Sequence, residues 1–500
     1  MAPRSLKPAF LLAAWCAAVV GCASSRGASV PSRFPDIASY REARERLVRQ
    51  EHARRLGSAL VLSVEEEAAG RRLAELRNAE DKRVGADLPP AHSFLLDKTK
   101  RLVEASPLLE VMRRLPKGGI LHVHGAAGGD LHWLVSHATY RPDCYMYLGD
   151  GGEAVRGTLR FFPESPGGDW HPVDALRSAA PEPKAFDEEI YRSITLGEED
   201  REAPDIWEEF RRCFRRAWRL FDDEETRAGH WRRMLESLID DNVQYVEFRG
   251  QPVDDAILRE ARSRDPDFAV KFIPVAGRSS DQQGVREALE RALTEREREP
   301  GRVVGFDLVE EEDHTHGTLY FAEEILAARR EAGRRGLTLP LFLHSGETSR
   351  AEGENLYDAL LLGARRIGHG LALVRHPLLM EMVREKGIAI EVCPISNQVL
   401  GYVGDLRAHP AVAYINAGIP VVLSPDDPGI MRHTLSHDFY EAFMAWELDL
   451  RDLKQLAIDS LLHSAMGPEE KARARAVWER RWAAFVRWLN GPGARPAGPS

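Results

Sequence analysis

The sequence predicts an α/β fold, a (β/α)8 TIM barrel, because eight short apolar runs typical of buried strands alternate with stretches of helical spacing. Side chains that can bind a metal follow four of these runs, and a barrel carries its chemistry at the carboxyl ends of its strands. The eight predicted strands are residues 119–124, 243–249, 269–276, 303–309, 339–344, 366–372, 389–394 and 420–424.

Helical patterns fill most intervals between these strands, as a parallel barrel requires. The first interval is the exception, because residues 130–240 hold far more than one crossover helix and include a Pro/Gly-rich patch at 162–172. We therefore expect an insertion after the first strand, at about residues 135–240, over the barrel mouth. The predicted helices between strands are 284–298, 319–334, 356–362 and 377–386, and helices after Ser436 complete a barrel domain of residues 118–490.

An N-terminal helical segment, residues 35–117, is predicted to precede the barrel. The stretch 37–86 is charged, nearly free of Pro and Gly, and spaces its apolar residues as a helix does. Residues 98–114 are typical of a further amphipathic helix that restarts at Ser106. At the other end, the Gly/Pro-rich residues 491–500 are expected to form a flexible tail.

The first residues are typical of an export signal. Two basic residues precede an apolar run at 9–20, which is too short to span a bilayer and has the length of a signal-peptide core. The run ends in Val-Val-Gly-Cys, which resembles the bacterial lipoprotein box, where the cysteine, here Cys22, carries the lipid. We expect a lipoprotein signal peptide at 1–21 and a tether at 22–34; an ordinary signal that contains a cysteine is the alternative.

The protein is then exported, either to a bacterial cell envelope or periplasm with a lipid anchor at Cys22, or by secretion. That anchor is its only expected contact with a membrane. Acidic residues outnumber basic ones, 78 against 68, so the net charge of -10 disfavours nucleic-acid binding.

The cysteines exclude a complete disulfide framework. With one cysteine in the signal peptide and Cys22 lipidated, an odd number remains. A bridge between Cys144 and Cys213 stays open, and Cys393, in an apolar strand, is expected to be a small buried residue.

Four short polar motifs follow predicted strands, and together they indicate one metal site. His122 and His124 are two residues apart on a strand, so both side chains point to the same face, and paired imidazoles suit zinc. Taken singly, each motif has a structural explanation, such as satisfied interior histidines or an Asp-Pro-Gly turn. One metal site explains all four motifs together. The motifs are His122-Val-His124, His344-Ser-Gly-Glu347, Gly368-His369-Gly370 and Ser424-Pro-Asp426-Asp427-Pro428.

A second histidine pair, His314 and His316, follows an acidic run at residues 310–313. Because this run lies beyond the fourth predicted strand, we expect it to be a solvated acidic loop and not a second metal site.

The motifs, in this order, resemble those of the adenosine deaminase family of metal-dependent barrels. Residues 112–124, 305–308, 391–400 and 435–444 resemble its secreted growth-factor branch, and the resemblance runs from the N-terminal helices to about residue 485. That branch has an N-terminal helical dimerisation segment and an insertion after the first strand. The resemblance therefore implies a homodimer formed through the N-terminal helices.

The resemblance also implies the roles of the site residues. Glu347 would protonate purine N1, His369 would orient and deprotonate the attacking water, and Asp427 would contact N7. The products would be inosine or 2'-deoxyinosine and ammonia. One Zn²⁺ per chain would be held by four protein ligands: His122, His124, His344 and Asp426.

Two departures from the family concern the substrate. The family has an acidic, ribose-binding residue after the His-x-His pair, where this chain has Gly125-Ala126-Ala127, and Asp130 is the candidate to replace it. Glu310 stands where the family often has a glycine whose amide meets the purine. Trp207 resembles a tryptophan that approaches the sugar, although a core position would explain it equally well.

The leading hypothesis is a zinc-dependent deaminase of adenosine or 2'-deoxyadenosine, and iron or cobalt could replace zinc in such a site. A deaminase of another or modified purine is the first alternative, favoured by Gly125 and Glu310. The second is an inactive nucleoside-binding or adhesion lipoprotein, against which the intact Glu347, His369 and Asp427 argue.

Overall fold

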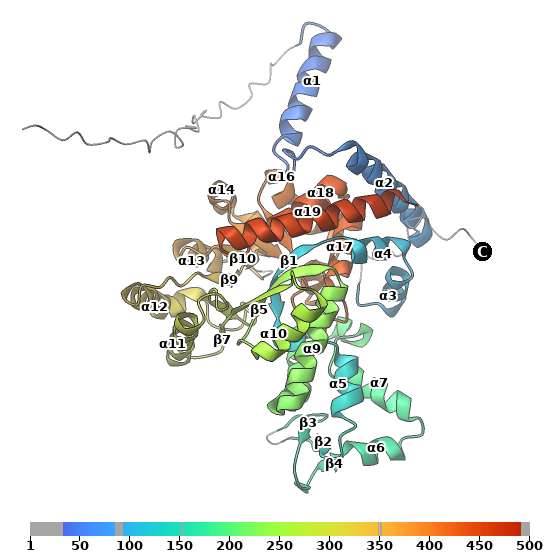
Figure 1. The fold of residues 1–500 in the computed structure, drawn as a ribbon, viewed down its shortest axis with the longest axis vertical. Coiled ribbons are helices and arrows are strands. Elements are labelled where there is room, and N and C mark those ends of the chain that lie inside the picture. The colour runs from blue at the N-terminus through green and yellow to red at the C-terminus, as the bar shows by residue number, and fades with distance from the viewer. Residues whose placement is uncertain (1–33, 86–93, 152–153, 349, 351–352, 492–500) are drawn as a thin grey trace, which may run out of the picture. The chain divides into compact units, whose positions relative to one another are not determined.

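The structure is a computed structural model that describes residues 34–85, 94–151, 154–348, 350 and 353–491 (Figure 1). By its internal contacts the chain divides into residues 1–53 and residues 54–500. The first unit contains helix α1 (Ile37–His52), and all other elements belong to the second. The signal peptide, the lipid anchor at Cys22 and the tail at 492–500 lie outside the described residues.

Eight parallel strand positions form a ring, which confirms the predicted (β/α)8 barrel. Hydrogen-bonded ladders join β1–β5–β6, β7–β8 and β9–β10–β11–β12. Parallel bridges from Phe306 to Leu341 and from Val123 to Asp426 join the remaining neighbours. The strands are β1 (Gly118–His124), β5 (Val243–Arg249), β6 (Ala269–Ile273) continued by β7 (Val275–Gly277), β8 (Asp307–Val309), β9 (Phe342–Ser345), β10 (Arg366–His369), β11 (Ala389–Val392) and β12 (Val421–Leu423).

Three strands differ in detail from the sequence prediction. The run 269–276 is divided at Pro274, which has no N–H for a ladder. The run 303–309 forms ladder pairs only in β8. The run 366–372 ends at His369, because Gly370 adopts a left-handed conformation, φ 59°, that starts a 3-10 turn.

The expected helices are present around the strands and before and after the barrel. Ser460 and Trp478 close the amino-terminal end of the barrel, since Gly119 N donates to Ser460 Oγ and Trp478 Nε1 donates to the Pro116 carbonyl. Within the described ranges, no helix has the length and apolar character needed to cross a membrane. The helices of this unit outside the β1–β5 interval are α2 (Val64–Val84), α3 (Asp97–Glu104), α4 (Pro107–Arg114), α10 (Asp255–Arg264), α11 (Gln282–Arg298), α12 (Ala322–Arg334), α13 (Asn355–Leu361), α14 (Pro377–Lys386), α15 (Pro394–Val399), α16 (Ala411–Ala417), α17 (Leu435–Ala445), α18 (Leu450–Leu462) and α19 (Pro468–Asn490).

The interval between β1 and β5 packs around a second hydrophobic core, to which Phe94, Ile395 and Ile430 also belong, and contains a small antiparallel sheet, β3–β2–β4 (Figure 1). Cys144 and Cys213 are buried in this core as free thiols, so no disulfide bond joins them in this structure. Its elements are α5 (Leu131–Ala138), β2 (Cys144–Tyr147), β3 (Leu159–Phe161), β4 (Trp170–Pro172), α6 (Val173–Ala179), α7 (Pro183–Ser193), α8 (Ile206–Ala217) and α9 (Glu224–Asp240).

Candidate metal centre and substrate cavity

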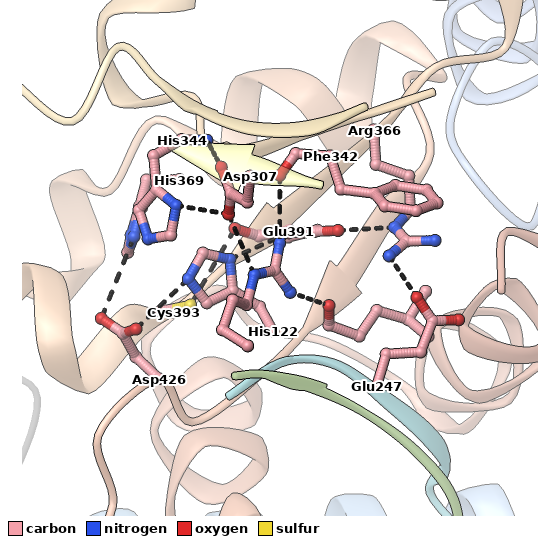
Figure 2. Close-up of polar contacts among 12 residues, drawn as sticks. His122, Glu247, Asp307, Phe342, His344, Arg366, His369, Glu391, Cys393 and Asp426 are labelled. Carbon is pink, nitrogen blue, oxygen red and sulfur yellow. Dashed lines mark hydrogen bonds and ion pairs between the residues drawn. The ribbon is translucent and has the colours of Figure 1, made fainter. Parts of the chain in front are cut away.

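Three imidazoles and a carboxylate converge at the carboxyl ends of the barrel strands (Figure 2). One potential ligand atom from each of the four residues lies within 4.8 Å of the others, and a second group joins Asp426 to His124 and Asp427. The four side chains meet at this face because strands β1, β9 and β10 end there, as does the turn after β12. The first group is His122, His344, His369 and Asp426.

The atoms that face one another in this cluster fit a cation. His122 Nε2 and His124 Nε2 lie 3.2 and 3.3 Å from Asp426 Oδ1. His122 Nε2, His369 Nε2 and Asp426 Oδ1 are buried without a hydrogen-bond partner, although buried polar atoms are normally paired. Imidazole nitrogens and a carboxylate oxygen are ligands that zinc accepts. The donor set therefore suits a metal ion.

Two carboxylates orient two of the histidines. His122 Nδ1 lies 2.9 Å from Glu391 Oε2, and His344 Nδ1 lies 2.7 Å from Asp307 Oδ2. Because a carboxylate accepts, each ring carries its proton on Nδ1 and leaves Nε2 unprotonated, and the Nε2 of His122 faces Asp426. This is the arrangement that a metal-binding histidine requires.

Arg249 joins these two carboxylates beneath the cluster. Its Nε donates to Asp307 Oδ2 at 3.1 Å, and its second terminal nitrogen donates to Glu391 Oε2 at 2.5 Å. It also donates to the Leu121 and Phe342 carbonyls, so one side chain from β5 contacts strands β1, β8, β9 and β11. All three charged side chains of this set are fully buried.

Burial opposes ionisation of these carboxyls, but their partners outweigh it. For Asp307 the partners are first the His344 ring and then Arg249, and for Glu391 they are Arg249 and Arg366, so both pKa values lie below the usual range. Arg366 continues the layer away from the metal cluster. It donates to Glu391 Oε1 and to Glu247 Oε2, each at 2.5 Å.

Glu347 lies beside the cluster on a turn held by Glu312. The backbone N–H groups of Gly346 and Glu347 donate to the Glu312 carboxylate at 3.0 and 2.8 Å, and Asn355 Nδ2 donates to it at 2.6 Å. The expectation of a solvated acidic loop at 310–313 is therefore wrong for Glu311 and Glu312, which are 4% and 8% exposed. They are buried because they accept hydrogen bonds from neighbouring segments.

Three carboxyl groups at this face differ in ionisation. Burial, with Asp426 next in effect, raises the pKa of Glu347 and of Asp427 well above the usual range. For Asp426, the nearby His122 and His124 rings outweigh burial and hold the pKa well below it. The cavity thus combines a carboxyl that ionises readily with two that hold their protons more strongly, as a donor of hydrogen bonds or protons must.

A cavity of about 1400 Å³ opens over the cluster, and its lining includes His124, Glu347 and Asp427. The insertion contributes Trp207, whose Nε1 donates to Tyr402 Oη at 2.9 Å. Asp130 is not part of this lining. Its side chain instead accepts from Trp133 N at the start of α5.

The two departures from the family both lie on the cavity wall. A Cβ atom at Gly125 would stand 2.6 Å from the Trp231 ring, so Trp231, not an acidic side chain, fills this position. Glu310 is exposed, accepts from Ser279 N at 2.7 Å, and has φ 84°, a strained value for a residue other than glycine.

Seven residues predicted from the sequence lie at this face, but the residues that contact and orient them were not predicted. Asp307, Glu391 and Arg249 were assigned no role, although charged residues within otherwise apolar strands are a signal of buried function or pairing. Asn397, 3.0 Å from His369 Nδ1, and Ser396, which donates to Asp426 Oδ2 at 2.7 Å, lie in the segment 391–400 that carries the resemblance, but they were assigned no role.

The barrel and its His/Asp cluster define the class of metal-dependent hydrolases. The comparisons narrow this class. The adenosine deaminase family model matches residues 199–477, and the adenosine/AMP deaminase N-terminal model matches residues 20–107. The chain therefore belongs to the adenosine deaminase family and is a hydrolase of the deaminase type.

Similar proteins span nearly the whole chain. It is 36% identical over 497 residues to adenosine deaminase 2 of Sus scrofa, covering 92% of this chain and 96% of the relative. It is 33% identical over 481 residues to adenosine deaminase 2 of Dictyostelium discoideum, covering 91% and 88%.

Solved structures share the fold at lower identity. An adenine deaminase from Arthrobacter aurescens aligns with a TM-score of 0.54 and 19% identity over 75% of this chain and 100% of that chain. An amidohydrolase from Burkholderia ambifaria with bound Zn aligns with a TM-score of 0.53 and 19% identity over 81% and 97%.

Proposed function

We propose that this protein is a zinc-dependent deaminase that converts adenosine or 2'-deoxyadenosine to inosine or 2'-deoxyinosine and ammonia. One observation carries the proposal: unpaired, buried imidazole and carboxylate atoms face one another beside a protonated carboxyl, Glu347, at the base of a cavity. Membership of the adenosine deaminase family and a structural neighbour with bound Zn support it.

The proposed ligands of one Zn²⁺ per chain are His122, His124, His344 and Asp426. A zinc ion there would lower the pKa of a bound water, so that hydroxide is available near neutral pH. The side chains that line the cavity would carry out the remaining steps of the reaction.

Glu347 keeps its proton because it is buried, and it would give that proton to purine N1, which makes C6 electrophilic. Asp427, also protonated, would donate a hydrogen bond to N7. His369 would contact the oxygen that attacks C6. The proton of the new C6 hydroxyl would pass to the amino group, so that ammonia leaves and C6 becomes a carbonyl.

The substrate pocket supports a purine nucleoside, with Trp207 and Glu310 as further contacts. A differently substituted purine is the second candidate, because Glu310 and the Trp231 ring beside Gly125 reshape the wall. An inactive binding protein would have no use for a protonated Glu347.

The decisive experiment follows the ultraviolet change from adenosine to inosine, and the release of ammonia, with purified zinc-loaded protein. A panel of nucleosides, bases and N6-substituted purines then ranks the candidates. Glu347→Gln should bind substrate with turnover lowered about 10²–10⁴-fold. Tight binding of every purine without ammonia release from the parent protein would refute the enzymatic proposal.

We also propose export with a lipid anchor at Cys22 and a homodimer formed through the N-terminal helices. Helix α1 supports the dimer, because it has no buried residue and leaves Ile37, Leu47 and Val48 exposed. Cys22→Ala should move the protein from the membrane fraction to the soluble fraction. Leu47→Lys should give a monomer by light scattering, and a dimer of unchanged mass would contradict the proposed interface.

A further inference from the structure

A chain of hydrogen bonds leads from His369 at the metal centre to the start of helix α16. Asn397 Nδ2 lies 3.0 Å from His369 Nδ1, and Asn397 Oδ1 lies 3.2 Å from His409 Nε2. The chain ends at the backbone of Ala411, whose N–H donates to His409 Nδ1 at 3.0 Å. The three side chains are 1%, 0% and 2% exposed, so their polar atoms depend on one another.

The Ala411 N–H group sets the direction of this chain, because a backbone amide can only donate. Pro410 has no N–H, so Ala411 supplies the first free amide hydrogen of α16. His409 Nδ1 must accept it, and a neutral imidazole that accepts at one nitrogen carries its proton on the other. Burial lowers the pKa of His409 to about 3, which agrees with a neutral ring.

The proton on His409 Nε2 then orients the Asn397 amide. His409 Nε2–H donates to Asn397 Oδ1, since the reverse orientation would set an NH₂ group against an N–H group. The Asn397 NH₂ group therefore donates to His369 Nδ1. That nitrogen has no proton of its own, and the His369 proton lies on Nε2.

We propose that Asn397 and His409 are positioning residues that fix His369 as the Nε2–H tautomer, so that His369 donates a hydrogen bond to the attacking oxygen. The proposal rests on the deaminase function proposed above. His369 Nε2 is buried, lacks a hydrogen-bond partner and lies 3.9 Å from Asp426 Oδ2. It therefore faces the metal centre with a hydrogen and not with a lone pair.

Two consequences follow for the site. A protonated nitrogen cannot bind a metal, so His369 is excluded from the ligand set despite its place in the cluster, and His124 takes the fourth position. His369 also differs from His122, whose proton on Nδ1 leaves Nε2 free. The sequence analysis expected His369 to deprotonate water, whereas the Nε2–H tautomer stabilises negative charge on the attacking oxygen.

Glu347 is the other neighbour of His369 Nδ1, and it does not reverse this assignment. Its Oε1 lies 3.5 Å from Nδ1, which is too long for a good hydrogen bond. Burial also raises the pKa of the Glu347 carboxyl, which disfavours the carboxylate form that would attract a proton to Nδ1.

The tautomer can be measured by NMR in protein with ¹⁵N-labelled histidine, without substrate and therefore independently of the proposed activity. Long-range ¹H–¹⁵N correlations distinguish a protonated from an unprotonated ring nitrogen, and loss of signals in His369→Gln assigns the residue. We expect His369 to be protonated at Nε2 alone. A proton on Nδ1, or on both nitrogens, overturns the proposal.

Asn397→Asp tests the relay, because a carboxylate accepts where the amide donated and should move the proton to His369 Nδ1. The kcat should fall about 10²–10³-fold, as for loss of one donor to a developing oxyanion, with KM changed less than about threefold. Asn242→Asp is the matched control, since Asn242 donates to the Arg114 carbonyl at the opposite end of the barrel. It should leave tautomer and kcat unchanged.

His409→Phe is a second variant that keeps a ring beside Trp446 but removes both ring nitrogens. The Asn397 amide is then free to turn, and we expect both His369 tautomers. An unchanged Nε2–H tautomer in either Asn397→Asp or His409→Phe overturns the relay. Unchanged tautomers in the variants would refute the relay, whereas absent deamination of adenosine by the parent protein would refute the proposed function. The two failures are therefore distinguishable.

Discussion

Asp307→Asn should weaken metal binding although Asp307 is not a proposed ligand. Asp307 Oδ2 accepts from His344 Nδ1 at 2.7 Å and from Arg249 Nε at 3.1 Å, while Oδ1 accepts from His344 N at 2.9 Å. Asparagine has one accepting oxygen, so its NH₂ group must face one of these donors. The His344 ring can relieve the clash by moving its proton to Nε2, which removes the lone pair that faces the metal.

The magnitude follows from the contact that is lost. Removal of a carboxylate that orients a metal-binding histidine typically costs about 10–100-fold in metal affinity, which corresponds to about 1.4–2.8 kcal/mol. A hydrogen bond to a charged group contributes about 1.5–3 kcal/mol, which agrees with the free energy expected from the loss of metal affinity. The orienting bond is fully buried and is not discounted by solvent.

The assay titrates zinc into metal-free protein against a chromophoric chelator of known affinity. Tyr245→Phe is the control, because it removes a hydrogen bond of 2.6 Å to Glu247 from the same buried layer without contact to a histidine. Its zinc Kd should stay within about twofold of the parent value, since each decade would need about 1.4 kcal/mol. A folded Asp307→Asn protein that binds zinc as tightly as the parent would refute the orienting role of Asp307.

Three further predictions concern acidity, metal and substrate. Because the pKa of Glu347 is raised and its acid form is required, kcat/KM should fall as the pH rises through that pKa. Glu312→Gln removes a nearby negative charge and should therefore shift this fall in kcat/KM to lower pH. A fall that stays at the same pH in Glu312→Gln contradicts the role of Glu347 as the acid. Chelation should lower the thermal midpoint, since zinc at a thousandfold excess over Kd stabilises by about 4 kcal/mol, whereas an unchanged midpoint argues against a structural link. Glu310→Gly should keep the unfolding free energy within about 1 kcal/mol, because it relieves a positive φ, while changing KM ratios across the purine panel; constant ratios would exclude Glu310 from specificity.

The sequence revealed the barrel and the residues at its strand ends because those signals are local. A buried strand is an apolar run, and His122 and His124 stand two residues apart at the end of one. The roles of Arg249 and Glu391 depend on contacts across 142 residues of chain, which no local pattern expresses. The same limit explains Gly125, whose meaning becomes clear only when the Trp231 ring is seen to fill its space.

The acidic run at 310–313 shows why composition misleads at a functional site. Four consecutive acidic residues are usually solvated, yet Glu312 is buried because it accepts the N–H groups of the turn that carries Glu347. Asp130 shows the converse: an acidic residue near the first motif fits the site on paper, but it lies at a helix start where its side chain caps a free N–H.

The buried charges beneath the cluster give a physical reason for a divalent ion. The carboxylates of Glu247, Asp307 and Glu391 face the guanidinium groups of Arg249 and Arg366, which leaves one negative charge within a fully buried layer. Asp426, whose pKa is held low, adds a second, while the raised pKa values of Glu347 and Asp427 disfavour further negative charge there. Because uncompensated buried charge is costly, a cation of charge two at the unpaired ligand atoms balances the set, whereas a monovalent ion would not. The barrel interior is therefore matched to its proposed metal in charge as well as in ligand type.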